Sequence, residues 1–123
     1  MTTISLTNST IVVENKIIQV IFAENSQIVL DNAHEIVDKV AELAKSGPQG
    51  LLIDASSMQF ISGEARKYFA SRKNPNLTAV AIVINSGIQK TFANLYLNFS
   101  RPVVPTQIFN QKSIAINWFK GKI

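Results

Sequence analysis

Short apolar runs that alternate with stretches of helical periodicity constrain the fold of this chain most strongly. The first two runs, "TIVV" and "IIQVIFA", are rich in β-branched residues and flank Glu14-Asn15-Lys16, so they predict an antiparallel hairpin with Asn at the turn. The pattern allows a short strand before it, at Ile4 to Leu6. Three later segments, "GLLIDA", "LTAVAIVI" and the end of "RPVVPTQIF", predict further strands.

Four segments between and after these runs predict helices. The first carries apolar residues at every third or fourth position, with acidic residues on the opposite face. Its apolar residues are Ala33, Ile36, Val37, Val40, Ala41 and Ala44. The others are "SGEARKYFASRK", with Ala65, Tyr68 and Phe69 inward; "IQKTFANLYLNF"; and "NQKSIAINWFK", with Ile114, Ala115 and Trp118 inward. This order predicts an α/β fold, whose mixed sheet has parallel strands joined by right-handed helical crossovers and an antiparallel hairpin at one side.

Composition indicates one globular domain over residues 1–123. The chain is 46% hydrophobic and 16% charged, unlike disordered chains, and its length suits one core. The chain has no cysteine, which excludes disulfides, thiolate zinc sites and cysteine nucleophiles and suits the cytoplasm. No apolar run approaches the roughly 20 residues that span a bilayer, and the first residues lack a signal-peptide pattern. We expect a soluble cytoplasmic protein that is not transmembrane.

Charge divides unevenly along the chain. Residues 1–64 hold all 8 acidic side chains and 3 lysines, a net charge of 3 − 8 = −5, while residues 65–123 hold 9 basic side chains and no acid, a net charge of +9. Such a division favours an anionic partner or self-association in which one half faces the other. The basic residues form no recognisable nucleic-acid module, so no DNA or RNA binding is expected.

Several segments together resemble a known family. They are an apolar strand ending in Asp54, the loop "ASSMQFISG", a helix, a hydrophobic strand, another helix and the closing "IFNQKSIAINWF". From about Ile11 to Phe119 this pattern resembles the STAS domain, and more closely the SpoIIAA-like (STAS-like) proteins, which are distantly similar to the CRAL-TRIO lipid-transfer fold. The resemblance implies a SpoIIAA-like mixed sheet with about four helices, and a small non-catalytic domain.

Ser62 has two interpretations. Anti-sigma-factor antagonists of the family are switched by phosphorylation of a Ser in a "D-S-S-G" or similar turn before the second helix. Ser62-Gly63 of "FISGE" match its Ser-Gly pair, although the Asp and the extra Ser ahead of that pair are missing here. The resemblance thus implies Ser62 as a phosphoacceptor. The residues themselves favour Ser62 as the N-cap of the helix that follows.

Two further polar sites were weighed from the residues. "INSGIQK" places Ser86, Gly87 and Lys90 at a helix start, where backbone N–H groups and the lysine could bind an anion, although a plain N-cap and tight turn explain the same residues. His34 lies near Asp31 and Asp38, and we expect surface pairing there and no metal. No base can be named for a serine nucleophile, so we expect neither an enzyme nor a cofactor.

The helix at residues 88–99 carries more apolar surface than packing on a sheet requires. Ile88, Phe92, Leu95 and Phe99 form one stripe, and Ala93, Tyr96 and Leu97 extend it around the helix. This surplus indicates a partner surface, an apolar ligand pocket or a lid.

Two hypotheses about the function follow. The first is a regulatory protein-interaction module, with an unknown protein partner or as a homodimer through the Phe92, Leu95, Tyr96 and Phe99 region. The second is a small apolar-ligand or lipid binder with an anionic head group near Lys90 or Arg101.

Overall fold

Strands and helices alternate along residues 1–48, 50–72, 74–85, 87–97 and 104–123, which the computed structural model describes. The strands are β1 (Thr2–Leu6), β2 (Ser9–Glu14), β3 (Ile17–Phe22), β4 (Gln27–Ile28), β5 (Gly50–Asp54), β6 (Phe60–Ile61), β7 (Ala79–Val83) and β8 (Thr106–Phe109). The helices are α1 (Leu30–Ala44), α2 (Gly63–Ser71), α3 (Gly87–Leu95) and α4 (Lys112–Phe119).

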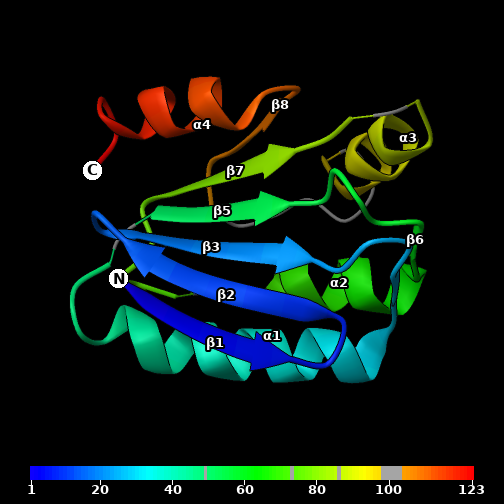
Figure 1. The fold of residues 1–123 in the computed structure, drawn as a ribbon, viewed down its shortest axis with the longest axis horizontal. Coiled ribbons are helices and arrows are strands. Elements are labelled where there is room, and N and C mark those ends of the chain that lie inside the picture. Colours follow the sequence, from blue (N-terminus) through cyan, green and yellow to red (C-terminus); the bar gives the residue numbers. More distant parts are fainter. Residues whose placement is uncertain (49, 73, 86, 98–103) are drawn as a thin grey trace.

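One mixed sheet of six strands, in the order β1-β2-β3-β5-β7-β8, organises the molecule (Figure 1). β1, β2 and β3 pair antiparallel, whereas β3, β5, β7 and β8 pair parallel. The predicted mixed sheet with an N-terminal antiparallel hairpin is therefore confirmed. The short strand allowed before the hairpin is present as β1.

The turn between β2 and β3 explains why the chain reverses there. Asn15 has φ 55° and Lys16 has φ 66°. Positive φ at both central residues is what a two-residue type I′ hairpin turn requires, and Asn tolerates it well. The predicted Asn turn thus fixes the register that pairs Glu14 with Ile17.

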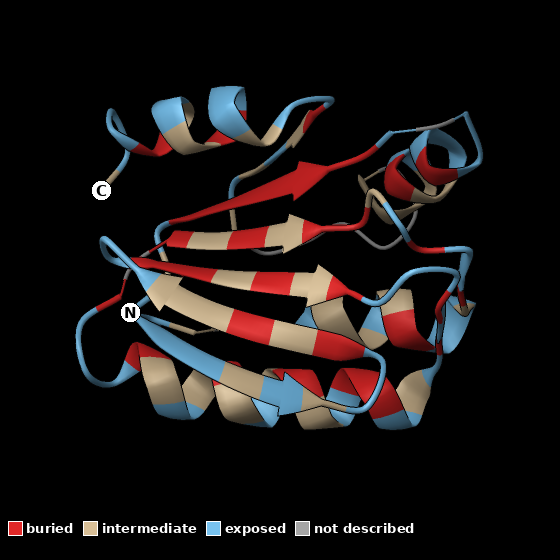
Figure 2. Cartoon of the chain, in the orientation of Figure 1, coloured by how far each residue is buried: buried red, intermediate tan, exposed pale blue. Residues whose placement is uncertain are grey.

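Helices cover the sheet on both faces. Side chains of α1 and α2 pack with alternate residues of β2 and β3, including Ile11, Ile18 and Val20. α3 adds Ala93 on the same face, against β7. On the opposite face α4 packs against β5, β7 and β8 through Ala115 and Phe119. All of β7 is consequently buried, as Figure 2 shows.

Most predicted inward residues are confirmed, and one is wrong. Ala33, Ile36, Val40 and Ala44 are buried on α1, and Ala65 is buried on α2 with Tyr68 and Phe69 packed against the same core. On α4, Ala115 is buried and Trp118 packs beside it, but Ile114 is 48% exposed. Because Ala115 and Phe119 lie one turn apart and face the sheet, Ile114 falls on the solvent side.

A second, two-stranded sheet was not predicted. β4 and β6 pair in parallel, with Gln27 opposite Phe60 and Ile28 opposite Ile61. Each strand has two residues, too few for a period-2 pattern to be recognised. This pair lies beyond the carboxyl ends of β3 and β5 (Figure 1).

The close approach of α4 to β5 gives a test of the packing. A Cβ atom on Gly50 would lie 2.9 Å from two ring carbons of the buried Phe119, whereas nothing lies within 4 Å of such an atom on Gly87. We expect Gly50→Ala to lower the free energy of unfolding by about 1 to 2 kcal/mol through overpacking. The matched Gly87→Ala should raise it by about 0.5 kcal/mol, because it restricts the unfolded chain. Urea denaturation compares them, and equal effects would show that Phe119 moves aside freely.

Candidate functional site

The carboxyl ends of the parallel strands gather most of the polar side chains that the sequence singled out. Asp54 ends β5, beside Val83 at the end of β7 and close to the loop that leads to Ser62. In open α/β sheets, ligands bind at this edge because loops from several strands converge there. This edge of the sheet is therefore the candidate site.

Ser62 is the N-cap of α2. Its Oγ accepts a hydrogen bond from the N–H of Ala65 at 3.1 Å, and its φ and ψ are extended. Its own N–H donates to the carbonyl of Ile28 at 2.9 Å, which ties the cap to β4. The capping interpretation is confirmed, whereas the phosphoacceptor role stays a prediction.

Arg66 folds back over the start of α2. Its Nη1 donates to the carbonyl of Ile61 at 2.7 Å, and its Nη2 lies 3.5 Å from where a Cβ atom of Gly63 would be. The guanidinium carbon is also 5.6 Å from the centre of the Phe92 ring. A fixed cation thus stands beside the helix N-terminus that Ser62 caps.

Three exposed apolar side chains lie on segments that adjoin Ser62 or contact β6. Val29, Phe60 and Ile88 are 44%, 42% and 63% exposed. Phe60 meets Phe92 edge to face, with ring centres 5.5 Å apart, and Ile88 precedes Phe92 by one turn of α3. Because Ile28 and Ile61 point inward, the neighbouring Val29, Phe60 and Ser62 share the outer side of the β4–β6 pair. We call Val29, Phe60, Ser62, Ile88 and Phe92 the β6 surface.

The buried residues of α3 are Gln89 and Ala93, which lie beside the apolar stripe, and Ile88 at the start of that stripe is exposed. The Gln89 amide donates to the carbonyls of Ser56 at 2.7 Å and Met58 at 3.1 Å, and its oxygen accepts the N–H of Asn85 at 2.6 Å. These bonds satisfy a polar group that periodicity alone assigns to the solvent side.

A cavity of about 310 Å³ lies between α1, α2, α3 and the sheet. Its walls are mostly apolar, and α3 contributes Phe92, Ala93 and Tyr96. Burial raises the pKa of Tyr96 to about 12, so this hydroxyl keeps its proton. Among the described residues the Tyr96 hydroxyl makes no hydrogen bond, so it is available to hydrogen-bond to a bound ligand.

The predicted ligand and interface residues are only partly brought together. Phe92 and Tyr96 line the cavity, Leu95 is half-buried but does not, and Phe99 lies outside the described residues. Lys90 was expected near a ligand head group, but it is exposed and borders a shallow depression with Gly87 on another part of the surface. The cations on the cavity wall are instead Arg66 and Arg72.

The remaining anion and ligand predictions fall partly outside the structure. Ser86 and Arg101 lie outside the described residues. Near the start of α3, the N–H of Asn85 is already taken by Gln89. Anion binding by Ser86, Gly87 and Lys90 stays a prediction.

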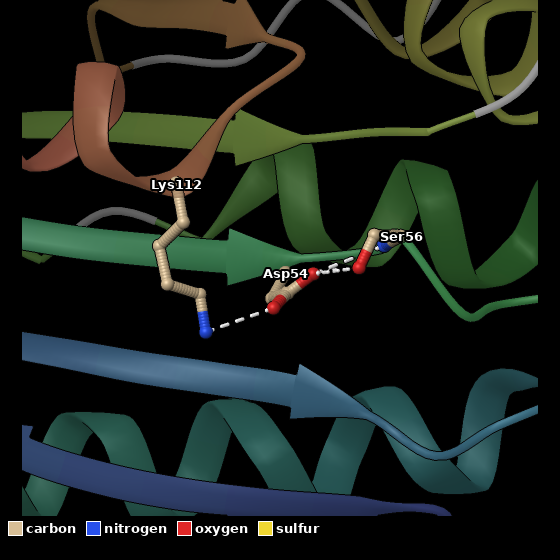
Figure 3. A network of polar contacts seen from close by, with 3 residues as sticks. All are labelled: Asp54, Ser56 and Lys112. Atoms are coloured by element: carbon tan, nitrogen blue, oxygen red, sulfur yellow. Dashed lines mark hydrogen bonds and ion pairs between the residues drawn. The ribbon is translucent and has the colours of Figure 1, made fainter.

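Asp54 forms a polar network with Ser56 and Lys112 (Figure 3). One carboxylate oxygen accepts from the Oγ of Ser56 at 2.5 Å and from its N–H at 3.1 Å, and the other pairs with the Nζ of Lys112 at 2.9 Å. Burial by itself raises the pKa of Asp54, but the bonds from Ser56 and Lys112 outweigh it and hold this pKa below its ordinary value of 3.8. The network therefore anchors α4 to the end of β5.

This ion pair also joins the two charge halves of the chain, since Asp54 belongs to the acidic half and Lys112 to the basic half. Acidic α1 and basic α2 are likewise neighbours on one face of the sheet. Opposite charges thus meet within a single chain. Sequence spacing could not reveal this, because the paired residues lie 58 positions apart (112 − 54 = 58).

His34 makes a different contact from the expected one. Its ring stacks on Tyr68, with centres 4.2 Å apart and planes 11° from parallel, and the guanidinium of Arg72 lies 4.7 Å from the centre of the Tyr68 ring. In the described part of the chain His34 makes no ion pair, so the expected surface pairing with Asp31 and Asp38 is wrong. An aromatic partner from α2 replaces the carboxylates.

The cap bond of Ser62 can be tested by substitution. We expect Ser62→Ala to lower the free energy of unfolding by about 1 kcal/mol, because the N–H of Ala65 loses its acceptor. Ser62→Asp keeps an acceptor and adds a charge that the helix N-terminus favours, so its stability should equal that of the wild type within about 0.5 kcal/mol. Urea denaturation measures both. Equal losses would show that the bond contributes nothing.

The Asp54 network gives a prediction about pH. Since its folded pKa is lowered, the carboxylate contributes stability above its unfolded pKa, near 3.8, and this contribution is lost as pH falls through the lower folded value. Asp54→Asn should therefore flatten the fall in stability below about pH 4. A pH dependence in the Asp54→Asn variant that runs parallel to that of the wild type would contradict this account.

The ion pair between Asp54 and Lys112 gives a second prediction. At pH 7, Lys112→Met should lower the free energy of unfolding by about 1 to 2 kcal/mol, whereas the exposed Lys120→Met should change it by close to nothing.

No helix in the described ranges has the length and apolar character needed to cross a membrane.

Comparisons with known proteins agree on the fold. No curated protein matches the sequence. SpoIIAA, an anti-sigma factor antagonist, in its unphosphorylated form, has a similar structure at TM-score 0.63 and 10% identity, covering 92% of this chain and 98% of that one. An anti-sigma factor antagonist from Mycobacterium paratuberculosis gives 0.64 and 14%, covering 91% and 92%.

A third similar structure is an uncharacterized protein from Shewanella loihica PV-4, of the DUF3478 family with a SpoIIAA-like fold. It has TM-score 0.58 and 12% identity and covers 89% of this chain and 90% of that one. The three structures confirm the SpoIIAA-like fold that the sequence resemblance implied. At the sequence level, residues 11–122 match the family model described as a domain of unknown function, DUF7793. The chain therefore belongs to the DUF7793 family and has the SpoIIAA-like fold.

Proposed function

We propose that this chain is a non-catalytic regulatory module that binds a protein partner through the β6 surface. Two of the similar structures are anti-sigma factor antagonists, which are regulatory proteins. The observation that supports the proposal most directly is the exposure of Phe60, two residues before Ser62, and of Ile88 on the neighbouring α3. An exposed apolar group beside a polar rim is typical of an interaction site.

Ser62 supplies a means of control. A phosphate on its Oγ would add about −1.5 to −2 charges in the middle of the β6 surface. The N-terminus of α2 and the guanidinium of Arg66 would receive that charge, so the helix would tolerate it. A partner that packs on Phe60 would instead meet a newly charged group. Phosphorylation at Ser62 would thus change docking without unfolding the domain.

Other side chains favour binding over catalysis. The Asp54 carboxylate is already neutralised by Lys112 and hydrogen-bonded to Ser56, and His34 is stacked on Tyr68. Neither is poised to activate a serine. The cysteine-free composition suits a reducing compartment, so we place the module in the cytoplasm.

A homodimer is one form that this interaction could take. Because acidic α1 already lies beside basic α2, contact between charge halves of two copies is not needed to explain the charge division. A dimer would instead use the apolar β6 surface, and its stability would then depend little on salt.

Photo-crosslinking in the native host tests the surface. We expect p-benzoylphenylalanine at Phe60 to capture a discrete partner, or a second copy of the chain if the protein is a homodimer. The same residue at Lys120, which is exposed at the C-terminal end of α4 and far from β6 (Figure 1), should capture neither. The Ser62→Asp change should reduce capture at Phe60. Equal capture at both positions, or none at Phe60, would reject the β6 surface as the docking site.

A second candidate function, binding of a small apolar ligand, is favoured by the cavity. Pockets for small molecules measure about 300 to 1,000 Å³ and are mostly apolar, with a few polar groups. The cavity of about 310 Å³ and its Tyr96 hydroxyl fit that description. Native mass spectrometry of the purified protein would reveal a ligand that copurifies.

A further inference from the structure

The wall of the cavity below α3 is apolar along the sheet. Among the residues that the structure describes, three charged side chains line this wall. These are Asp38 from α1, Arg66 from α2 and Arg72, the C-cap residue of α2. Since apolar walls hold the body of a guest and charges fix its orientation, the arrangement of these three residues indicates the chemical class of the guest.

Asp38 and Arg72 are exposed residues of this wall, and Arg72 contacts the Tyr68 ring. Arg72 is stacked over the Tyr68 ring, and His34, which stacks on that ring, precedes Asp38 by one turn of α1. One acid and one base are therefore both present in this part of the wall. Their opposite charges favour neither an anionic nor a cationic guest.

Arg66 lines the same cavity wall beside Phe92. Within the described residues it forms no ion pair with a carboxylate. One of its N–H groups donates to the carbonyl of Ile61, and its plane lies near the Phe92 ring, which also lines the cavity. Guanidinium has five N–H donors in a rigid fork that matches carboxylate geometry, so donors remain for a guest.

We propose that the cavity binds a small amphiphile with an apolar body and a single carboxylate head group, and that the head group binds Arg66. The proposal rests on the ligand-binding candidate above and adds the class of ligand. The apolar body lies against Ile53, Ile82 and Phe92, and the Tyr96 hydroxyl is available to any second polar atom of the guest.

The volume sets the size of this guest. An engineered apolar cavity of about 150 Å³ accepts benzene, so a cavity of about 310 Å³ holds roughly twelve non-hydrogen atoms by proportion. A straight-chain carboxylate such as decanoate has this size. A chain of this length is therefore the probe that matches the volume of the cavity.

Three probes with the same chain separate the possibilities: decanoate and decyltrimethylammonium, each below its micelle concentration, and 1-decanol below its solubility limit. We expect calorimetric titration to show decanoate binding about tenfold more tightly than 1-decanol, the factor that one charge-assisted hydrogen bond supplies, and the cation binding most weakly. Decanoate should also raise the melting temperature of the wild type.

Two variants assign the preference to Arg66. Arg66→Gln should abolish the advantage of decanoate over 1-decanol, whereas Lys67→Gln, which removes the same charge from an exposed neighbour that does not line the cavity, should keep it. Nuclear Overhauser contacts between decanoate and the rings of Phe92 and Tyr96 locate the ligand in the wild type. This measurement holds even if Arg66→Gln does not fold.

The outcomes distinguish this proposal from the candidate on which it rests. Equal binding of decanoate and 1-decanol, with contacts to Phe92 and Tyr96, would overturn the carboxylate assignment and leave the apolar-ligand candidate standing. No binding of any probe would overturn both. An equal loss in Lys67→Gln would overturn the assignment to Arg66, because the preference would then come from net charge alone.

Discussion

Burial of the central strands on both faces is the constraint on which the rest of this structure depends. β7 is buried along its whole length because α3 covers one face and α4 the other. Parallel strands joined by helices require this cover, and their carboxyl ends then open at one edge of the sheet. The loops after β5 and β7 meet at that edge, so the polar network of Asp54, the buried Gln89 and the cap of α2 lie close to one another.

Two side chains connect the two candidate functions. Phe92 contacts Phe60 on the β6 surface and also lines the cavity, and Arg66 lines the cavity while it holds the carbonyl that precedes Ser62. A guest in the cavity would touch the same groups that a partner outside would meet. Coupling between sites needs shared contacts of this kind, with different arrangements in the two states.

The sequence predicted most of the helices and strands well and the burial of individual side chains less well. Alternating runs and helical periods located the hairpin, the later strands of the main sheet and the helices, because each of these patterns repeats several times within one element. The pair β4–β6 was missed since two residues carry no period. Ile114 was placed inward because hydrophobic residues are counted as core, yet a helix buries only the stripe that faces its neighbour. Gln89 was passed over for the opposite reason, since its burial depends on carbonyls from the β5–β6 loop.

The sequence by itself determined the order of the helices and of the strands of the main sheet, the Asn turn, the cap at Ser62 and the composition of each helix, because these depend on interactions between residues close along the chain. Tertiary structure alone decided which polar groups meet. Lys112 reaches Asp54, His34 stacks on Tyr68, and Arg66 stands between the cavity and Ser62. The packing of helices on the sheet brings some of these residues together. The other contacts depend on the conformation that a side chain adopts within that packing. No local pattern specifies where such side chains end, because their positions depend on the whole core.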